Sequence, residues 1–145
     1  MPLPFTDLVR SIANHFDRCE TTPAPELVTT QEIGAYGERV AAAFVRRHGY
    51  RILTRNYRTT RGEIDLICRH GDLLVFVEVR SRASVDFGRP IETIDAAKQD
   101  ALRYAARRYL ELLKRDDILY RFDAVEVMLK SGETPVCTLL DDVFA

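Results

Sequence analysis

Apolar side chains recur at helical spacing in two separate stretches within the first 50 residues of the chain. The first stretch, at residues 5–16, predicts a short amphipathic helix that either covers the domain or forms a homodimer. The second is predicted to run from about Thr30, a residue type that caps helices, to His48, and Gly49 favours its end there. Threonines and prolines in the segment between them, residues 19–29, are typical of a linker.

Apolar runs typical of β-strands follow the second helix closely. A loop containing Gly88 and Pro90 then leads to another stretch of helical spacing and a further strand-like run. This order predicts an α/β domain with a mixed sheet flanked by helices over residues 30–145, and an extra N-terminal helix over residues 1–18. The expected elements are strands at 51–58, 63–69 and 73–82, a helix at 93–114, a strand at 119–129, and one more strand and a turn within 135–145.

Two of these strand-like runs are separated only by Gly71-Asp72, which predicts a tight hairpin. Glycine at the first central position suits a type II′ turn, and paired positions then sum to 143. In that register Asp65 faces Glu78, and Glu63 faces Arg80. The alternate positions are apolar on both strands, so we expect that side of the hairpin in the core. They are Ile64, Leu66, Cys68, Val75, Val77 and Val79.

The opposed carboxylates of Asp65 and Glu78 are the main chemical signal. Directly opposed residues have Cβ atoms about 5 Å apart, where like charges repel. A divalent cation would remove that repulsion, and Mg²⁺ binds proteins through one or two carboxylates plus water and phosphate oxygens. Such a site suits metal-assisted phosphodiester hydrolysis. The alternative is a solvated acidic pair, each member bound to an arginine; a three-residue loop would also offset the two side chains.

Composition limits the class of protein. An apolar fraction of 46% and a charged fraction of 30% are ordinary for one globular domain. There is no apolar run long enough to cross a bilayer and no signal-peptide pattern, so we expect no membrane association and a cytoplasmic location. The three cysteines are far apart and have no CxxC spacing, which indicates neither a disulfide scaffold nor a zinc site.

Positive charge is concentrated between Glu38 and Glu63, although the net charge of the chain is −1. That stretch has arginines but no acidic residue. Phosphate contacts supply most non-specific affinity for nucleic acids. Taken singly, each arginine fits a solvated surface, but together they favour a nucleic-acid-binding surface. The candidates are Arg46, Arg47, Arg55, Arg58 and Arg61.

A set of short motifs resembles the YraN family of bacterial proteins from about Gln31 to the C-terminus. The motifs are Gly37-Glu38, Gly62-Glu-Ile-Asp-Leu-Ile67, Phe76-Val-Glu-Val-Arg80, Gly88, Lys98 and Arg121-Phe-Asp123. The family is similar to Holliday-junction resolvases of the PD-(D/E)XK nuclease superfamily. The resemblance implies a restriction-endonuclease-like fold, DNA as partner, branched or damaged DNA included, and Mg²⁺ or Mn²⁺ as cofactor.

The resemblance also implies roles for individual residues. Asp65 and Glu78 would bind the metal together with the Val79 carbonyl, and Glu38 would be a further ligand or would position water. A helix glutamate on a solvated face is the alternative for Glu38. Glu63 has no catalytic role in this interpretation and is expected to form a salt bridge with Arg80.

Arg80 stands where the nuclease superfamily usually has a lysine. Arginine stays protonated in proteins, so it can stabilise a phosphate but cannot take up a proton from water. Lys98, on the following helix, could supply the amine, or it is a plain surface lysine. Three functions remain. The opposed carboxylates favour a metal-dependent endonuclease, and Arg80 favours a catalytically inactive nucleic-acid-binding module that keeps the fold. The third is an interaction protein whose N-terminal helix docks a partner.

Overall fold

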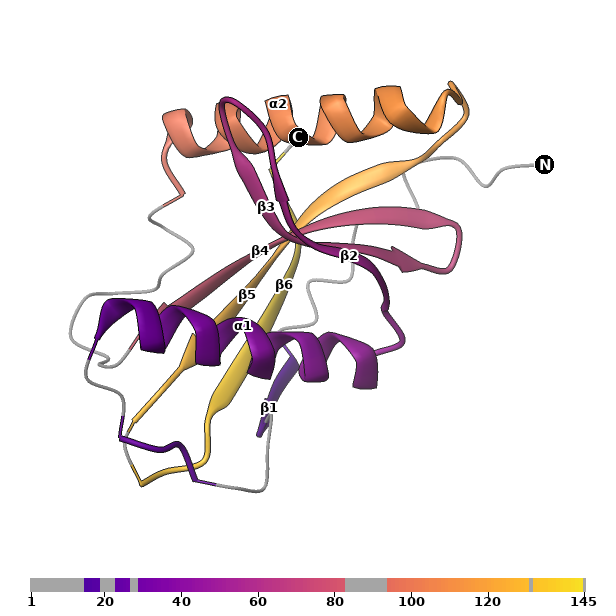
Figure 1. Cartoon of the computed structure of the whole chain (residues 1–145). Coiled ribbons are helices and arrows are strands. Elements are labelled where there is room, and N and C mark those ends of the chain that lie inside the picture. Colours follow the sequence, from indigo (N-terminus) through magenta and orange to yellow (C-terminus); the bar gives the residue numbers. More distant parts are fainter. Residues whose placement is uncertain (1–14, 19–22, 27–28, 83–93, 131, 145) are drawn as a thin grey trace.

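The computed structural model describes residues 15–18, 23–26, 29–82, 94–130 and 132–144, and this part of the chain forms a six-stranded mixed sheet between two helices (Figure 1). The strand order is β1-β6-β5-β4-β3-β2, with β4 and β5 parallel and all other pairs antiparallel. The elements are β1 (His15–Arg18), α1 (Thr30–Arg47), β2 (Arg51–Arg58), β3 (Glu63–His70), β4 (Leu73–Arg82), α2 (Ala96–Leu113), β5 (Tyr120–Met128) and β6 (Val136–Phe144). This is the mixed α/β arrangement expected of a restriction-endonuclease-like fold.

Most predicted elements lie within a few residues of their predicted bounds, and the differences have local causes. The first long helix begins at Thr30 as predicted, but its N-cap is the preceding residue, Thr29, which forms a capping box with Glu32. The second begins at Ala96, because the Asp95 side chain accepts the Lys98 N–H as N-cap. Gly49, at φ 84°, follows the first helix as predicted.

The N-terminal prediction is wrong where it can be tested. Residues 15–18, expected at the end of a helix, form β1 and pair with β6 in the register Phe16–Thr138. They therefore extend the sheet and do not stand apart as a helical extension. The rest of the predicted helix, and residues 19–22 and 27–28 of the predicted linker, lie outside the described residues.

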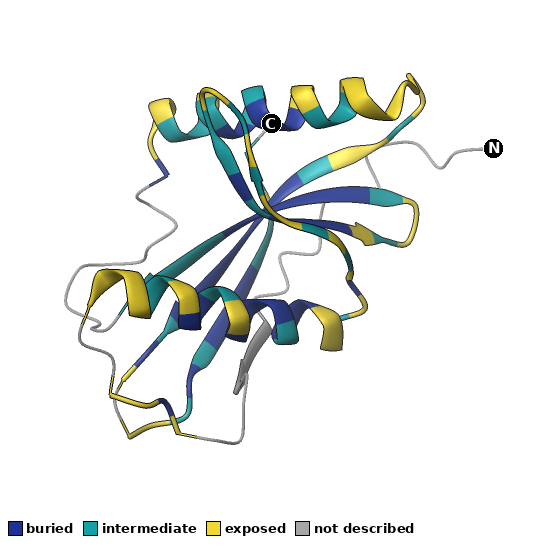
Figure 2. Cartoon of the chain, in the orientation of Figure 1, coloured by how far each residue is buried: buried dark blue, intermediate teal, exposed yellow. Residues whose placement is uncertain are grey.

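Each face of the sheet has its own hydrophobic core, as the buried strands beneath exposed outer helix surfaces show (Figure 2). Leu66 and Val77 pack with α1 on one face. Ile67 and Phe76, on the face that carries Asp65, pack with α2 on the other. The prediction that Ile64 belongs with Leu66 is wrong, since Ile64 packs with α2.

The state of the cysteines and the apolar length of the helices bear on two expectations drawn from composition. Cys68 is a buried free thiol, and burial raises its pKa to about 12. Cys137 is disulfide-bonded, which the cysteine spacing did not indicate. Neither α1 nor α2, the helices of the described part, is long and apolar enough to cross a membrane.

Candidate active site

The β3–β4 hairpin has the register that the sequence predicts. Leu66 pairs with Val77, Ile67 with Phe76 and so on to His70 with Leu73, so that each pair sums to 143. Gly71 has a φ of 60°, and Asp72 is not among the residues with positive φ, as a type II′ turn requires. The register brings Asp65 and Glu78 to neighbouring positions on adjacent antiparallel strands.

The ladder ends at Leu66–Val77, and Asp65 takes over one of its hydrogen bonds. The Val79 N–H donates to Asp65 Oδ2 at 2.8 Å, so the carboxylate is held against the β4 backbone. On the other side, Asn56 of β2 has a φ of 51°, a left-handed conformation that asparagine tolerates better than most residues. Asn56 lies between the pairs Arg55–Leu66 and Tyr57–Ile64. On one side of it, Leu66 packs in the α1 core, and on the other, Ile64 packs in the α2 core.

Glu78 is a buried carboxylate with an incomplete set of partners. Its side chain is 7% exposed, and Oε1 lies 3.3 Å from Nζ of Lys98 on α2. Its other oxygen, Oε2, is buried and has no hydrogen-bond donor in the described structure. A buried oxygen without a donor is costly, so Glu78 Oε2 needs a proton or a cation.

Burial and carboxylate repulsion set the protonation of this pair. Burial, and then the nearby Asp65 carboxylate, raises the pKa of Glu78 to about 8, although Lys98 acts in the opposite direction. Burial also raises the pKa of Asp65, against the lowering effect of the Val79 N–H. Two ionised carboxylates cannot hydrogen-bond to each other, so Glu78 is the member that holds the shared proton at neutral pH when no cation is bound.

Glu38 approaches the pair from α1. Burial, followed by Asp65, raises the pKa of Glu38, and the two side chains are within hydrogen-bonding reach. The neighbouring Gly37 explains this approach, because a Cβ at Gly37 would collide with the Ser81 side chain on β4. Glycine therefore lets α1 lie directly against β4 and brings Glu38 to the end of the sheet where Asp65 lies.

The β2–β3 hairpin is fixed against α2 in a similar way. A Cβ at Gly62 would collide with the backbone carbonyl of Ala101, so only glycine permits this contact. Gly62 lies three residues before Asp65, and Ala101 lies three residues after Lys98. The contact therefore sets the position of Asp65 relative to the lysine that pairs with Glu78.

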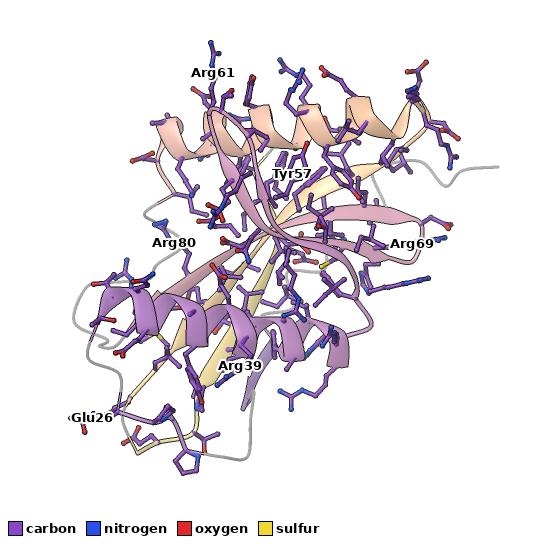
Figure 3. The ribbon with its side chains drawn as sticks, in the orientation of Figure 1. Glu26, Arg39, Tyr57, Arg61, Arg69 and Arg80 are labelled. Carbon is purple, nitrogen blue, oxygen red and sulfur yellow. The ribbon has the colours of Figure 1, made fainter. Side chains whose placement is uncertain are left out.

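Arg80 lies on the same side of β4 as Glu78, on the side of the molecule where α1 and α2 begin (Figure 3). Its register partner on β5 is Glu126, which is 7% exposed and in turn pairs with the buried Thr138 on β6. Glu126 is not among the residues predicted from the sequence, although alternation along β5 could have placed it on this face. The expected salt bridge between Glu63 and Arg80 is wrong, since Glu63 pairs with Arg58 at 3.5 Å.

The five arginines predicted to bind nucleic acid lie on α1, on β2 and at the tip of the β2–β3 hairpin, and their role in binding remains a prediction. Arg46 and Arg47 are exposed in the last turn of α1, and Arg46 and Arg55 are both near enough to Cys68 to affect its ionisation. Arg58 lies near Glu38 and Glu63. Arg61 is at the hairpin tip beside α2 (Figure 3).

The described residues contain no group of three or more His, Cys, Asp or Glu side chains that could hold a metal ion. The pair Asp65 and Glu78 offers two carboxylates, and an ion such as Mg²⁺ that retains several water ligands needs one or two. Both expected roles of Glu38, as a further ligand or in positioning water, remain predictions. Whether the Val79 carbonyl contributes remains a prediction, since the contact seen at Val79 uses its N–H.

Comparison with known sequences identifies the family. The profile of a family described as "Uncharacterised protein family UPF0102" matches residues 37–127, a range that includes the carboxylates and Lys98. The chain belongs to this family. UPF0102 is the YraN family that the motifs resemble.

Curated relatives support this assignment. A UPF0102 protein from Chlorobium phaeobacteroides is 42% identical over 109 residues, which cover 75% of this chain and 86% of the relative. One from Alkaliphilus oremlandii is 45% identical over 101 residues, covering 68% and 86%. One from Caldicellulosiruptor bescii is 38% identical over 117 residues, covering 79% and 98%. Their names state no activity, so function must be argued from the site.

Proposed function

We propose that this UPF0102 protein is a metal-dependent endonuclease that hydrolyses DNA phosphodiester bonds, with branched or damaged DNA as its substrate. The observation that supports this most strongly is the buried carboxylate pair, in which Glu78 Oε2 has no donor. A protein that only binds nucleic acid has no need for two carboxylates in contact, because they repel each other and would repel the phosphate. A nuclease needs them to bind a cation.

The residues present fit Mg²⁺ or Mn²⁺. Both ions prefer oxygen ligands, and the unpartnered Glu78 Oε2 and the ionised Asp65 offer them at one place. When bound, the ion would polarise a phosphate oxygen and make water a stronger nucleophile. The Val79 N–H holds Asp65 in one orientation, so the site is partly organised before any ion enters.

The chain's own residues supply the remaining functions. Lys98 has three N–H donors, of which one is directed to Glu78 Oε1, so others are available for a phosphate oxygen. Arg80, on the same side of β4, would bind the phosphate through two N–H groups of its guanidinium and stabilise charge in the transition state. Glu38 would orient the attacking water or accept its proton.

The second candidate function is that of a DNA-binding module without catalysis, and the observation that favours it is Arg80 at the usual lysine position. In that case the carboxylate pair would hold a proton permanently, as the raised pKa of Glu78 allows at neutral pH. Lys98 weakens this alternative, since it brings an amine to Glu78 from another element.

A cleavage assay distinguishes the two functions. Purified protein is incubated with labelled linear, nicked, flapped and four-way DNA in Mn²⁺ or in Mg²⁺. We expect weak cleavage that Mn²⁺ favours and that Glu78→Gln abolishes. The matched control is Asp72→Asn, which removes a fully exposed carboxylate from the same hairpin and should leave cleavage unchanged. Absence of cleavage on every substrate with both metals would favour the binding module.

A further inference from the structure

A groove of about 530 Å³ lies between the tip of the β2–β3 hairpin and the outer surface of α2. Arg61 lines it from the hairpin, and Arg103 and Arg107 line it from the helix, together with Tyr104 and Asp100. Arg103 and Arg107 are four residues apart, so they share one face of α2. Three arginines from two elements thus converge on one hollow.

The single carboxylate in this groove does not neutralise it. Asp100 is engaged by Arg103, whose Nη1 donates to Asp100 Oδ1 at 3.1 Å. Arg61 and Arg107 have no ion pair with a carboxylate of the described residues. Elsewhere on α2 the pattern differs, since Arg108 is paired with Glu111 at 3.1 Å. Two positive charges without counter-charges in one groove attract a polyanion.

Arg61 is already held in position. Its guanidinium lies over the Tyr104 ring at 5.2 Å from the ring centroid, a cation–π contact. The Tyr104 hydroxyl is 3.4 Å from Thr60 Oγ1, on the same hairpin tip. The tip is further fixed by a hydrogen bond from the Thr59 N–H to the Gly62 carbonyl at 2.8 Å. A cation ordered in advance loses less side-chain entropy on binding.

The groove and the carboxylate pair share helix α2. Lys98, the partner of Glu78, lies on α2 between Ala97 and Asp100, which both line the groove. From Lys98 to Arg107 the helix rises about 14 Å, which corresponds to about four nucleotides at about 3.4 Å per nucleotide. We propose that this groove binds the sugar–phosphate backbone of a DNA strand that runs from the carboxylate pair along α2, with Arg61 and Arg107 bound to its phosphates. The proposal rests on the proposed function in its choice of DNA as ligand.

The test is DNA binding without metal, measured by fluorescence anisotropy in EDTA at several salt concentrations. Arg61→Gln combined with Arg107→Gln should weaken binding and reduce the slope of log affinity against log salt by about 1.8, that is, about 0.9 per lost phosphate contact. The matched control is Arg108→Gln with Arg115→Gln, which has the same change in charge but removes arginines already paired with carboxylates. The control should bind like the wild type, and all variants should melt at the same temperature.

Three outcomes would overturn the groove: an unchanged slope in the Arg61/Arg107 variant, an equal loss in the control, or a loss seen with RNA of the same sequence but not with DNA. Failure of the proposed hydrolysis is separable. If the wild type cuts no DNA but its DNA affinity depends on Arg61 and Arg107, the groove binds DNA and the proposed hydrolysis is wrong. If the wild type cuts DNA and neither binding nor cleavage depends on the two arginines, the proposed hydrolysis stands and the groove is not the DNA-binding site.

Discussion

Lys98 Nζ lies 3.3 Å from Glu78 Oε1, and this contact joins the start of α2 to the middle of the sheet. Glu78 is the one buried carboxylate of the described structure that has an oxygen without a hydrogen-bond partner. The lysine compensates part of the cost of burying Glu78, since it lowers a pKa that burial and Asp65 raise. The contact reaches only Oε1, so Oε2 stays without a donor in the described structure.

Metal binding should stabilise the wild type and should depend on both carboxylates. At a Mn²⁺ concentration ten times its dissociation constant, a ligand of the folded state adds about 1.4 kcal/mol to the free energy of unfolding. That corresponds to a rise in melting temperature of about 4 °C for a domain of this size. Asp65→Asn and Glu78→Gln should abolish the rise without lowering stability in EDTA, because each replaces a carboxylate of the pair with a neutral amide of the same size. Equal Mn²⁺ shifts in wild type and both variants would reject the site.

The stability of the metal-free protein should depend on pH through Glu78. Its pKa is raised from 4.5 to about 8 in the folded state, so the folded state binds the proton more tightly than the unfolded chain. This stability is therefore fully present below about pH 4.5 and is lost as the pH rises through about 8, at up to about 1.4 kcal/mol per pH unit. Urea denaturation in EDTA between pH 5 and pH 9 measures it, and Glu78→Gln should flatten the profile.

Lys98→Gln should raise the pH at which Mn²⁺ binds. Lys98 lowers the pKa of Glu78, and the metal binds only the deprotonated carboxylate. Without the lysine, each unit of upward pKa shift costs about tenfold in metal affinity near neutral pH. Mn²⁺ titrations followed by melting temperature at pH 6 to pH 9 test this, with Lys98→Arg as the variant that keeps the charge. An unaltered pH midpoint in Lys98→Gln would show that Lys98 does not act through Glu78.

Arg80 should matter to cleavage and not to metal binding. Loss of a donor that stabilises the transition state commonly costs about 100-fold in rate, so Arg80→Ala should lose about that much. Arg80→Lys should lose less, because it keeps the charge but not the paired N–H groups. Single-turnover cleavage of the best DNA substrate in Mn²⁺ measures both. A rate for Arg80→Lys above that of the wild type would mean that arginine handicaps this enzyme.

The two glycines of α1 should respond in opposite ways to alanine. Gly34 has nothing within 4 Å of an added Cβ, so Gly34→Ala should stabilise the helix by about 1 kcal/mol. Gly37→Ala brings the new methyl group against Ser81 and should destabilise the protein by about 1–3 kcal/mol. Chemical denaturation compares the pair directly. Since Glu38 follows Gly37, only the second variant should also reduce cleavage; a neutral Gly37→Ala would contradict the close contact of α1 with β4.

The sequence by itself determined the local features of this protein. The two-residue Gly71-Asp72 turn sets the β3–β4 register, because a shift by one residue would move every side chain to the other face. Alternation along the two strands then places Asp65 near Glu78. Helical periodicity predicted both long helices. The first begins at Thr30 as predicted, and the second begins at Ala96, directly after its cap Asp95.

Tertiary structure decided what comes together from distant parts of the chain. No local pattern shows that Lys98 contacts Glu78, that Glu63 prefers Arg58 to Arg80, or that residues 15–18 join the sheet at β6. Nor does a local pattern show that Arg61, at the tip of the β2–β3 hairpin, lines one groove with Arg107 of α2. These contacts depend on where each helix packs on the twisted sheet. Close contacts at Gly37 and Gly62 fix those positions, and helical or strand periodicity does not show them.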